Sequence, residues 1–127
     1  MVVYRVQDPE GRGPFRPGFS RYWLDEDLGE RSRPPSWGEE FGHDLISKNY
    51  RKRHHYGSAV KTLHEVTIWF SASELLRLKL YGYSVVKLQA DRILAESTVQ
   101  VVFERKKPFN IGAEIIPLAH VVFGIYV

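Results

Sequence analysis

The hydrophobic pattern of the chain changes from extended runs at its ends to helical spacings in its middle. Residues 2–6 form a β-branched and aromatic run that stops at Asp8-Pro9-Glu10-Gly11, so they predict a first strand and its turn. Residues 56–60 predict a second short strand. The later part of the chain predicts further strands over residues 83–88, 98–103, 115–116 and 120–127.

Three capping-box spacings predict where helices begin in the middle of the chain. The first, Ser36 to Glu39, predicts a short helix that runs to about Ile46. The other two boxes are Thr62 to Glu65 and Ser71 to Glu74. The second helix is expected to bury Leu63, Val66, Trp69 and Phe70, and the third to bury Leu75, Leu76, Leu78 and Leu80. Gly82 is expected to end the third helix.

Helices in the middle and strands at both ends predict an α+β fold with a small, largely antiparallel sheet and two or three helices. A chain of 127 residues is close to the commonest domain size, so residues 1–127 are expected to form a single domain. Hydrophobic residues at 43% and aromatics at 13% can fill one core.

Residues 8–38 are rich in glycine, proline and arginine. This density of chain-breaking residues predicts a loop region without long regular elements. Aromatic residues recur along the same region, which favours a loop packed against the domain and disfavours a free linker. They are Phe15, Phe19, Tyr22, Trp23 and Trp37.

Composition narrows the functional classes only modestly. The chain has no cysteine, which excludes disulfides and thiol nucleophiles and is typical of a reducing compartment. It has no signal peptide and no apolar run long enough to span a bilayer, so we expect a cytoplasmic protein without membrane contact. A net charge of +3 permits contact with phosphates but does not require it.

Several common active-site motifs are missing. Gly11-Arg12-Gly13 lacks the third glycine and the following helix of a dinucleotide-binding loop, and there is no Walker sequence. The five histidines do not have the spacing of metal ligands, so we expect no metal site. No Gly-x-Ser-x-Gly sequence marks a serine hydrolase.

A basic run, Arg51-Lys52-Arg53, lies between Tyr50 and Tyr56. Basic residues beside aromatic ones can contact phosphates and stack on bases, so this run is a candidate nucleic-acid site. The alternative interpretation is a solvated loop between a helix and a strand, because charged runs are usually solvated.

Arg5, Ser58 and Gln100 are polar residues on three predicted strands that are expected to converge. They belong to a wider pattern that resembles small uncharacterised proteins of bacteria and their phages. The pattern consists of Tyr4-Arg5, the glycine-rich residues 11–18, Tyr56-Gly57-Ser58-Ala59 before a helix ending in Trp69-Phe70, Gly82-Tyr83, and Gln100-Val101-Val102-Phe103.

More distantly, these short sequence segments resemble those of proteins with the ADP-ribosyltransferase fold, in which an Arg, a Ser and a Glu on separate strands hold NAD. The resemblance implies that NAD is the cofactor and that Arg5 contacts its pyrophosphate with help from Arg12 or Arg16. Tyr56 and Ser58 would line the same cleft. Gln100 stands where the family has its catalytic Glu, and Glu96 replaces it only if a turn brings it close.

Two hypotheses follow. In the first, the chain is an ADP-ribosyltransferase-like domain of bacterial or phage origin that binds NAD or a related nucleotide, with or without cleaving it. In the second, it is a non-enzymatic, phage-type inhibitor or regulator that uses its arginine-rich half to bind nucleic acid or a host protein complex.

Overall fold

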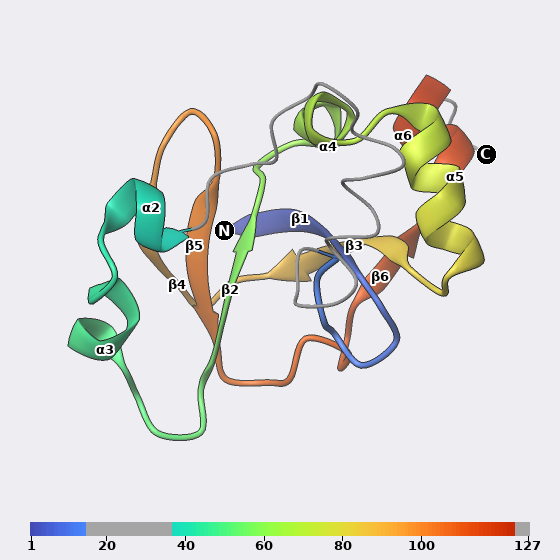
Figure 1. Cartoon of the computed structure of the whole chain (residues 1–127). Helices are drawn as coiled ribbons and strands as arrows, with labels where there is room; N and C mark the ends of the chain where they lie inside the picture. Colours follow the sequence, from blue (N-terminus) through green and yellow to red (C-terminus); the bar gives the residue numbers. More distant parts are fainter. Residues whose placement is uncertain (15–36, 124–127) are drawn as a thin grey trace.

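The computed structural model describes residues 1–14 and 37–123, and it places two small antiparallel sheets next to each other (Figure 1). The first sheet has the strand order β1 (Val2–Gln7), β3 (Ser84–Gln89), β6 (Glu114–Ile116). The second sheet has the order β2 (His55–Ala59), β5 (Val101–Arg105), β4 (Arg92–Glu96). We call them the β1 sheet and the β2 sheet.

The two sheets meet where β1 passes the end of β2. The amide of Tyr4 donates to the carbonyl of Val60 over 2.8 Å, and the amide of Val60 donates back to Tyr4 over 2.9 Å. This reciprocal pair satisfies backbone groups that would otherwise be left unpaired at a buried sheet edge. It joins the first segment of the chain to the strand that follows the basic run.

Five short helices lie around the sheets in the described residues. They are α2 (Trp37–Phe41), α3 (Leu45–Asn49), α4 (Leu63–Trp69), α5 (Ala72–Leu80) and α6 (Leu118–Phe123). Figure 1 shows α4, α5 and α6 grouped at one end of the molecule, and α2 and α3 beside β4 and β5 at the other. The α+β class with antiparallel strands is confirmed, with two sheets in place of the one expected and more helices.

The predicted helix starts at Thr62 and Ser71 are confirmed. Thr62 Oγ1 accepts from the amide of Glu65 at 3.2 Å. Ser71 forms a full capping box, in which its Oγ accepts from the amide of Glu74 at 3.2 Å and Glu74 Oε1 accepts from the amide of Ser71 at 2.8 Å. Gly82 follows α5 with a φ of +89°, the left-handed conformation expected of a residue that ends a helix.

The first predicted helix is interrupted. Gly42 adopts a φ of +101°, so the helix expected to run to Ile46 ends at Phe41 and a second, α3, begins at Leu45. Glycine adopts this conformation without steric cost, which is why the chain turns there. The break places α3 directly before the basic run.

The apolar side chains form two cores. The first lies between the β1 sheet and the three grouped helices, and its buried members include Val6, Val66, Leu75, Leu78, Val85 and Val121. The second lies between the two sheets, and its members include Val3, Val86, Leu88, Val101 and Phe103. Alternation along the strands sends successive side chains to different cores, as the period of an extended chain requires.

Two predictions about apolar residues are wrong. The expected strand over residues 120–127 is instead helix α6 as far as Phe123, and the last four residues lie outside the described part of the chain. Pro117 precedes this helix, and its carbonyl accepts from the amides of His120 and Val121 at 3.0 and 3.2 Å, which starts the first helical turn.

The second concerns α5, where Leu75 and Leu78 are buried but Leu76 and Leu80 are 59% and 87% exposed. Leu76 lies about 100° around the helix from Leu75, and Leu80 about 200° from Leu78, so the four leucines do not share one face.

Strand β4 carries mixed polar and apolar residues and was not expected from the sequence. It forms because a tight turn over residues 97–100, closed by a 2.9 Å hydrogen bond from the amide of Ser97 to the carbonyl of Gln100, folds it back onto β5. The strand expected over residues 98–103 therefore starts later, at Val101, and continues to Arg105.

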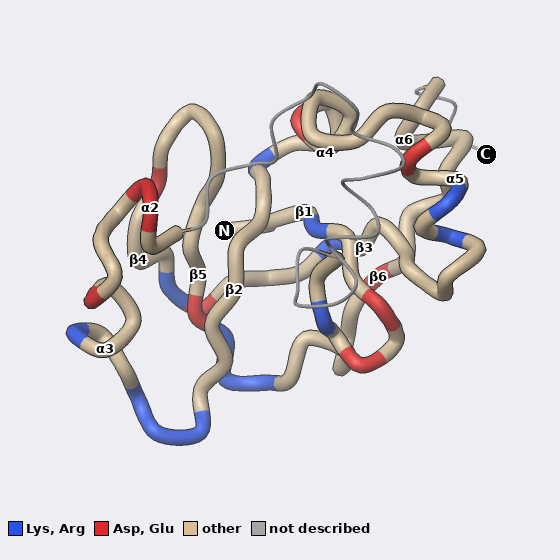
Figure 2. Tube along the Cα trace, viewed as in Figure 1, with Lys and Arg blue, Asp and Glu red and all other residues tan. Residues whose placement is uncertain are grey.

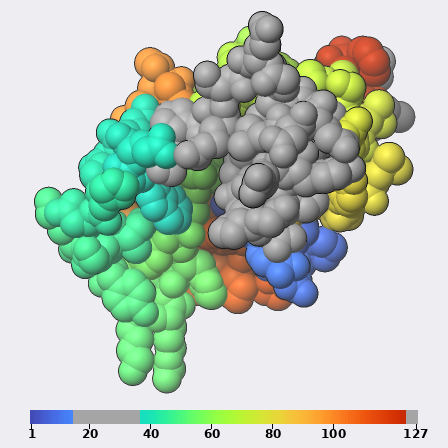
Figure 3. Space-filling model, viewed as in Figure 1, coloured from blue at the N-terminus to red at the C-terminus, as the bar shows by residue number. Residues whose placement is uncertain are grey.

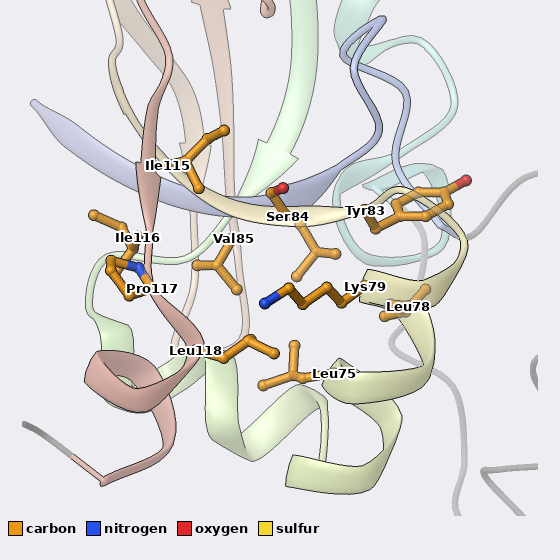
Figure 4. Close-up of a pocket in the computed structure, with 11 residues that line it drawn as sticks. Leu75, Leu78, Lys79, Tyr83, Ser84, Val85, Ile115, Ile116, Pro117 and Leu118 are labelled. Carbon is orange, nitrogen blue, oxygen red and sulfur yellow. The ribbon is translucent and has the colours of Figure 1, made fainter.

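A small cavity of about 70 Å³ opens between α5, β3, β6 and the start of α6 (Figure 4). Its lining is mostly apolar, with Leu75, Val85 and Leu118 around it and the Lys79 amine projecting among them. Ligand pockets usually measure about 300–1,000 Å³, so this cavity does not accommodate a dinucleotide.

The guanidinium of Arg5 lies between the sheets. Its Nη1 donates to the carbonyl of Ser58 on β2 at 3.1 Å, its Nη2 donates to the carbonyl of Gly11 at 3.1 Å, and the group lies 4.7 Å from the centre of the Phe109 ring. Burial lowers the pKa of Arg5 to about 10, although the charge of Asp8 opposes the shift. Arg5 therefore keeps its charge at neutral pH and joins β1 to β2 and to two loops.

Because Gly57 has no side chain, the Arg5 guanidinium can lie directly against the backbone of β2. A Cβ at Gly57 would lie 2.5 Å from Arg5 Nη1 and 2.7 Å from the Phe109 ring. Gly57→Ala should lower the free energy of unfolding by about 1–3 kcal/mol, measured by urea denaturation. Gly13→Ala is the matched control, because its Cβ would lie at an ordinary 3.5 Å from Arg5 Nη2. Equal stability of Gly57→Ala and the unchanged protein would contradict the packing described.

Candidate nucleic-acid interface

Five basic residues gather at one end of the β2 sheet, and we call them the basic tip. They are Arg51, Lys52 and Arg53 before β2, and Lys106 and Lys107 after β5. The pairing of His55 with Arg105 places the start of β2 beside the end of β5, so the two basic segments leave the sheet at the same end. Figure 2 shows both segments at the lower edge of the molecule.

The basic tip projects from the rest of the structure. All five residues are exposed, and the space-filling view shows the segment before β2 protruding below the sheet (Figure 3). Within the described part of the chain, the side chains of Lys52, Arg53, Lys106 and Lys107 form no ion pair; Arg51 Nη1 lies 3.6 Å from Glu104 Oε1. The tip therefore presents positive charge that the described carboxylates leave largely uncompensated.

Residues 51–54 form a tight turn, in which the amide of His54 donates to the carbonyl of Arg51 at 3.1 Å. Arg53 has a φ of +67° in this turn, a conformation that favours glycine or asparagine. A side chain with a Cβ loses about 1–2 kcal/mol there relative to right-handed backbone. The turn thus keeps an exposed arginine in this position at a cost in stability.

Glu104 on β5 anchors the basic tip to the β2 sheet. Its side chain is 1% exposed, and Oε2 accepts from the hydroxyl of Tyr56 at 2.8 Å and from Nη2 of Arg92 at 2.7 Å. His54 Nδ1 lies 3.2 Å from Oε1, so a protonated His54 adds a further ion pair. A buried carboxylate requires partners of this kind because leaving it unpaired is costly.

The same network holds the chain on both sides of Tyr50. The hydroxyl of Tyr56 accepts from the amide of Arg51 at 2.5 Å, and Arg92 Nη2 donates to the carbonyl of Asn49 at 2.6 Å. Both contacts are made by groups that are themselves bonded to Glu104. The segment between α3 and β2 is therefore positioned by a buried charge and not only by its own turn.

The pKa of Glu104 reflects these contacts. Burial alone raises it, but the hydrogen bonds from Tyr56 and Arg92 outweigh burial and hold the pKa below its ordinary value of 4.5. Burial and the bond to Glu104 also raise the pKa of the Tyr56 hydroxyl, which keeps its proton for donation. Glu104 is therefore ionised in the folded protein at neutral pH.

The other half of the basic tip is fixed by Arg105. This side chain is 6% exposed, and its two terminal nitrogens donate to the carbonyls of Pro108 and Ile111, each at 2.7 Å. Gln7 on β1 donates to the carbonyl of Phe109 at 2.9 Å. These bonds set the path of the loop that carries Lys106 and Lys107.

The residues expected to bind NAD lie on different faces of the β2 sheet. Paired residues of antiparallel strands project to the same face, so Tyr56 and Ser58 share a face with Glu104. Arg5 lies on the opposite side, over Gly57, with its guanidinium bonded to backbone carbonyls. The structure therefore brings Arg5 next to β2 but does not aim it at the face that carries the Ser58 hydroxyl.

Gln100, Glu96 and Arg12 have other partners. Gln100 is 7% exposed and donates to Glu40 of α2 at 3.0 Å. The turn that would bring Glu96 toward Gln100 exists, but the Glu96 carboxylate pairs with Lys61 at 2.8 Å.

Arg12 pairs with Asp8 at 2.8 Å, an interaction that raises the pKa of Arg12, while the bonds from Arg12 and Glu10 outweigh burial and lower that of Asp8. Arg16 lies outside the described residues.

Sequence reasoning found the first half of the basic tip but missed Glu104, Arg92, Lys106 and Lys107. One signal was available: Glu104 and Arg105 directly continue an apolar run of strand residues, where a charged side chain needs a buried partner. That Arg92 is such a partner depends on a strand pairing that the sequence does not reveal.

Within residues 1–14 and 37–123, no group of three or more His, Asp or Glu side chains is arranged to hold a metal ion. No helix in the described chain has the length and apolarity needed to cross a membrane.

Comparison with known proteins assigns the chain to a phage family. The family described as Bacteriophage T4 Y00F protein matches residues 1–114, and the chain belongs to this family. The expected resemblance to small phage proteins is therefore confirmed, whereas the more distant resemblance to ADP-ribosyltransferases finds no support. Neither a curated protein nor a solved structure matches the chain.

The Glu104 network generates a prediction about stability and pH. Glu104→Gln should lower the free energy of unfolding by about 2 kcal/mol at neutral pH, because charged hydrogen bonds from Tyr56 and Arg92 are weakened. A carboxylate with a lowered folded pKa stabilises the fold above its unfolded pKa and stops doing so as the pH falls through its folded value. The difference between the two proteins should thus shrink as the pH falls below about 4.5.

The measurement is urea denaturation of both proteins at a series of pH values. Glu96→Gln is the control, because that carboxylate is exposed and its ion pair with Lys61 lies at the surface. A stability difference for Glu104→Gln that stays constant from neutral to acidic pH would show that the charge of Glu104 is not what stabilises the fold.

Proposed function

We propose that this member of the T4 Y00F family is a nucleic-acid-binding protein and that the basic tip is its binding surface. The observation that carries the proposal is the gathering of five cations from two distant segments, four of them without an ion pair among the described residues. Backbone phosphates are the partners that such a surface attracts, since each neutralised phosphate releases counterions.

The way the tip is built supports the proposal. A merely solvated loop needs no anchoring, yet this one is tied to the sheet by Tyr56, Arg92 and the buried Glu104. Arg53 occupies a backbone conformation that disfavours it. Strained residues often mark functional positions, and here the strained position of the turn is occupied by an exposed arginine.

The hypothesis of an NAD-binding, ADP-ribosyltransferase-like domain draws its support from sequence resemblance alone. The position of Arg5 between the sheets and the contacts of Gln100 and Glu96 do not add to it. A rise in melting temperature with NAD, and none with oligonucleotides, would favour it over nucleic-acid binding. Binding to an acidic host protein without affinity for nucleic acid would favour the inhibitor hypothesis.

The proposal predicts which charges matter. Replacing Lys52 and Lys106 together with glutamine should weaken binding to a single-stranded oligonucleotide and reduce the slope of log affinity against log salt by about 1.4, since each phosphate contact contributes about 0.7. Fluorescence anisotropy at several salt concentrations measures both quantities.

The matched control replaces Lys61 and Lys79 with glutamine. It has the same net charge, but Lys61 follows the opposite end of β2 and Lys79 lies on α5. Its affinity and salt slope should stay close to those of the unchanged protein. Equal weakening in both double variants would mean that net charge, and not the basic tip, governs binding, and the proposal would fail.

Arg53 allows binding to be separated from stability. Arg53→Gly removes the charge and relieves the left-handed strain, so it should weaken binding while raising the free energy of unfolding by up to about 1 kcal/mol. Arg53→Ala removes the same charge and keeps the strain, so it should weaken binding equally without the gain in stability. Unchanged affinity in both variants, by anisotropy, would remove Arg53 from the binding surface.

A further inference from the structure

We infer that the basic tip binds single-stranded rather than double-stranded nucleic acid, with the ring of Tyr50 as the surface on which a base stacks. The inference rests on the proposed function and specifies its ligand.

Tyr50 lies next to the basic tip and is exposed. It is the residue that caps the C-terminal end of α3, directly before Arg51, and 60% of it is exposed to solvent. An aromatic ring this exposed loses the hydrophobic stabilisation that burial would provide. The three residues that follow it, Arg51 to Arg53, are cations, so a polyanion bound by the tip passes within reach of the ring.

The ring is held in position by the buried network. Tyr50 and Tyr56 have ring centroids 6.0 Å apart and planes tilted by 35°, a contact between aromatic neighbours. Tyr56 is fixed through its hydroxyl to Glu104, and the carbonyl of Asn49 is held by Arg92. A preorganised ring loses little conformational freedom when a base stacks on it, which favours binding.

The shape of the tip favours a single strand. Base faces are covered by their neighbours in a duplex and are accessible in a single strand, where stacking on aromatic side chains contributes to binding without regard to sequence. Readout of a duplex through its major groove uses an α-helix or a two-stranded ribbon. Here the cations are carried by a four-residue turn and a loop, and the adjacent helix α3 spans only Leu45–Asn49.

The experiment compares three probes by anisotropy or competition: a labelled oligothymidine of about 15 nucleotides, a duplex of the same length, and inorganic polyphosphate. The unchanged protein should bind the single strand more tightly than the duplex. Tyr50→Leu should reduce the affinity for the single strand about tenfold and leave its salt slope unchanged, because stacking involves no counterions. Its affinity for polyphosphate should not change.

Tyr50→Phe is the matched control, because it keeps the aromatic face and should bind the single strand like the unchanged protein. Melting temperatures of both variants verify that the fold is intact. Tighter binding of the duplex, or no loss in Tyr50→Leu, would overturn the inference; if the Lys52 and Lys106 variant still weakens binding, the proposed function stands. Absence of binding to all three probes would contradict both.

Discussion

Two charged side chains on opposite sides of β2, the half-buried Arg5 and the buried Glu104, hold this structure together. On the inner side, the Arg5 guanidinium joins β1 to the carbonyls of Ser58 and Gly11. On the outer side, the Glu104 carboxylate gathers Tyr56 and Arg92. Each charge is costly to bury and is stabilised only when its partners are in place, so the two groups constrain how the sheets and loops fit together.

The two charges have different consequences for function. Both terminal nitrogens of Arg5 donate to backbone carbonyls and its guanidinium lies against the Phe109 ring, so Arg5 acts as a structural residue. Glu104, through Tyr56 and Arg92, holds the segment between α3 and β2, whose basic side chains are exposed. Its interactions therefore position the basic tip. Both charges are therefore needed for the fold, but only the second bears directly on a binding surface.

The local features of the fold were predictable because they depend on neighbours in the chain. The N-cap at Thr62, the capping box at Ser71 and the glycine after α5 act over a few residues, and all three helix boundaries are confirmed. Predictions failed where the structure of an apolar segment depends on tertiary packing. Residues 118–123 form a helix, and Leu76 and Leu80 are exposed on α5. Burial depends on what lies opposite, which local patterns do not contain.

The amino-acid sequence alone determined the α+β class, the basic run before β2 and the aromatic residues beside it, because composition and local periodicity suffice for these. Only the tertiary structure decided that Lys106 and Lys107 join this run, since the pairing of His55 with Arg105 is made between residues far apart in the chain. It also decided that Arg5 faces the interior and that Glu104 supports the basic tip. The pairing of β2 with β5 therefore places the two basic segments side by side as one surface.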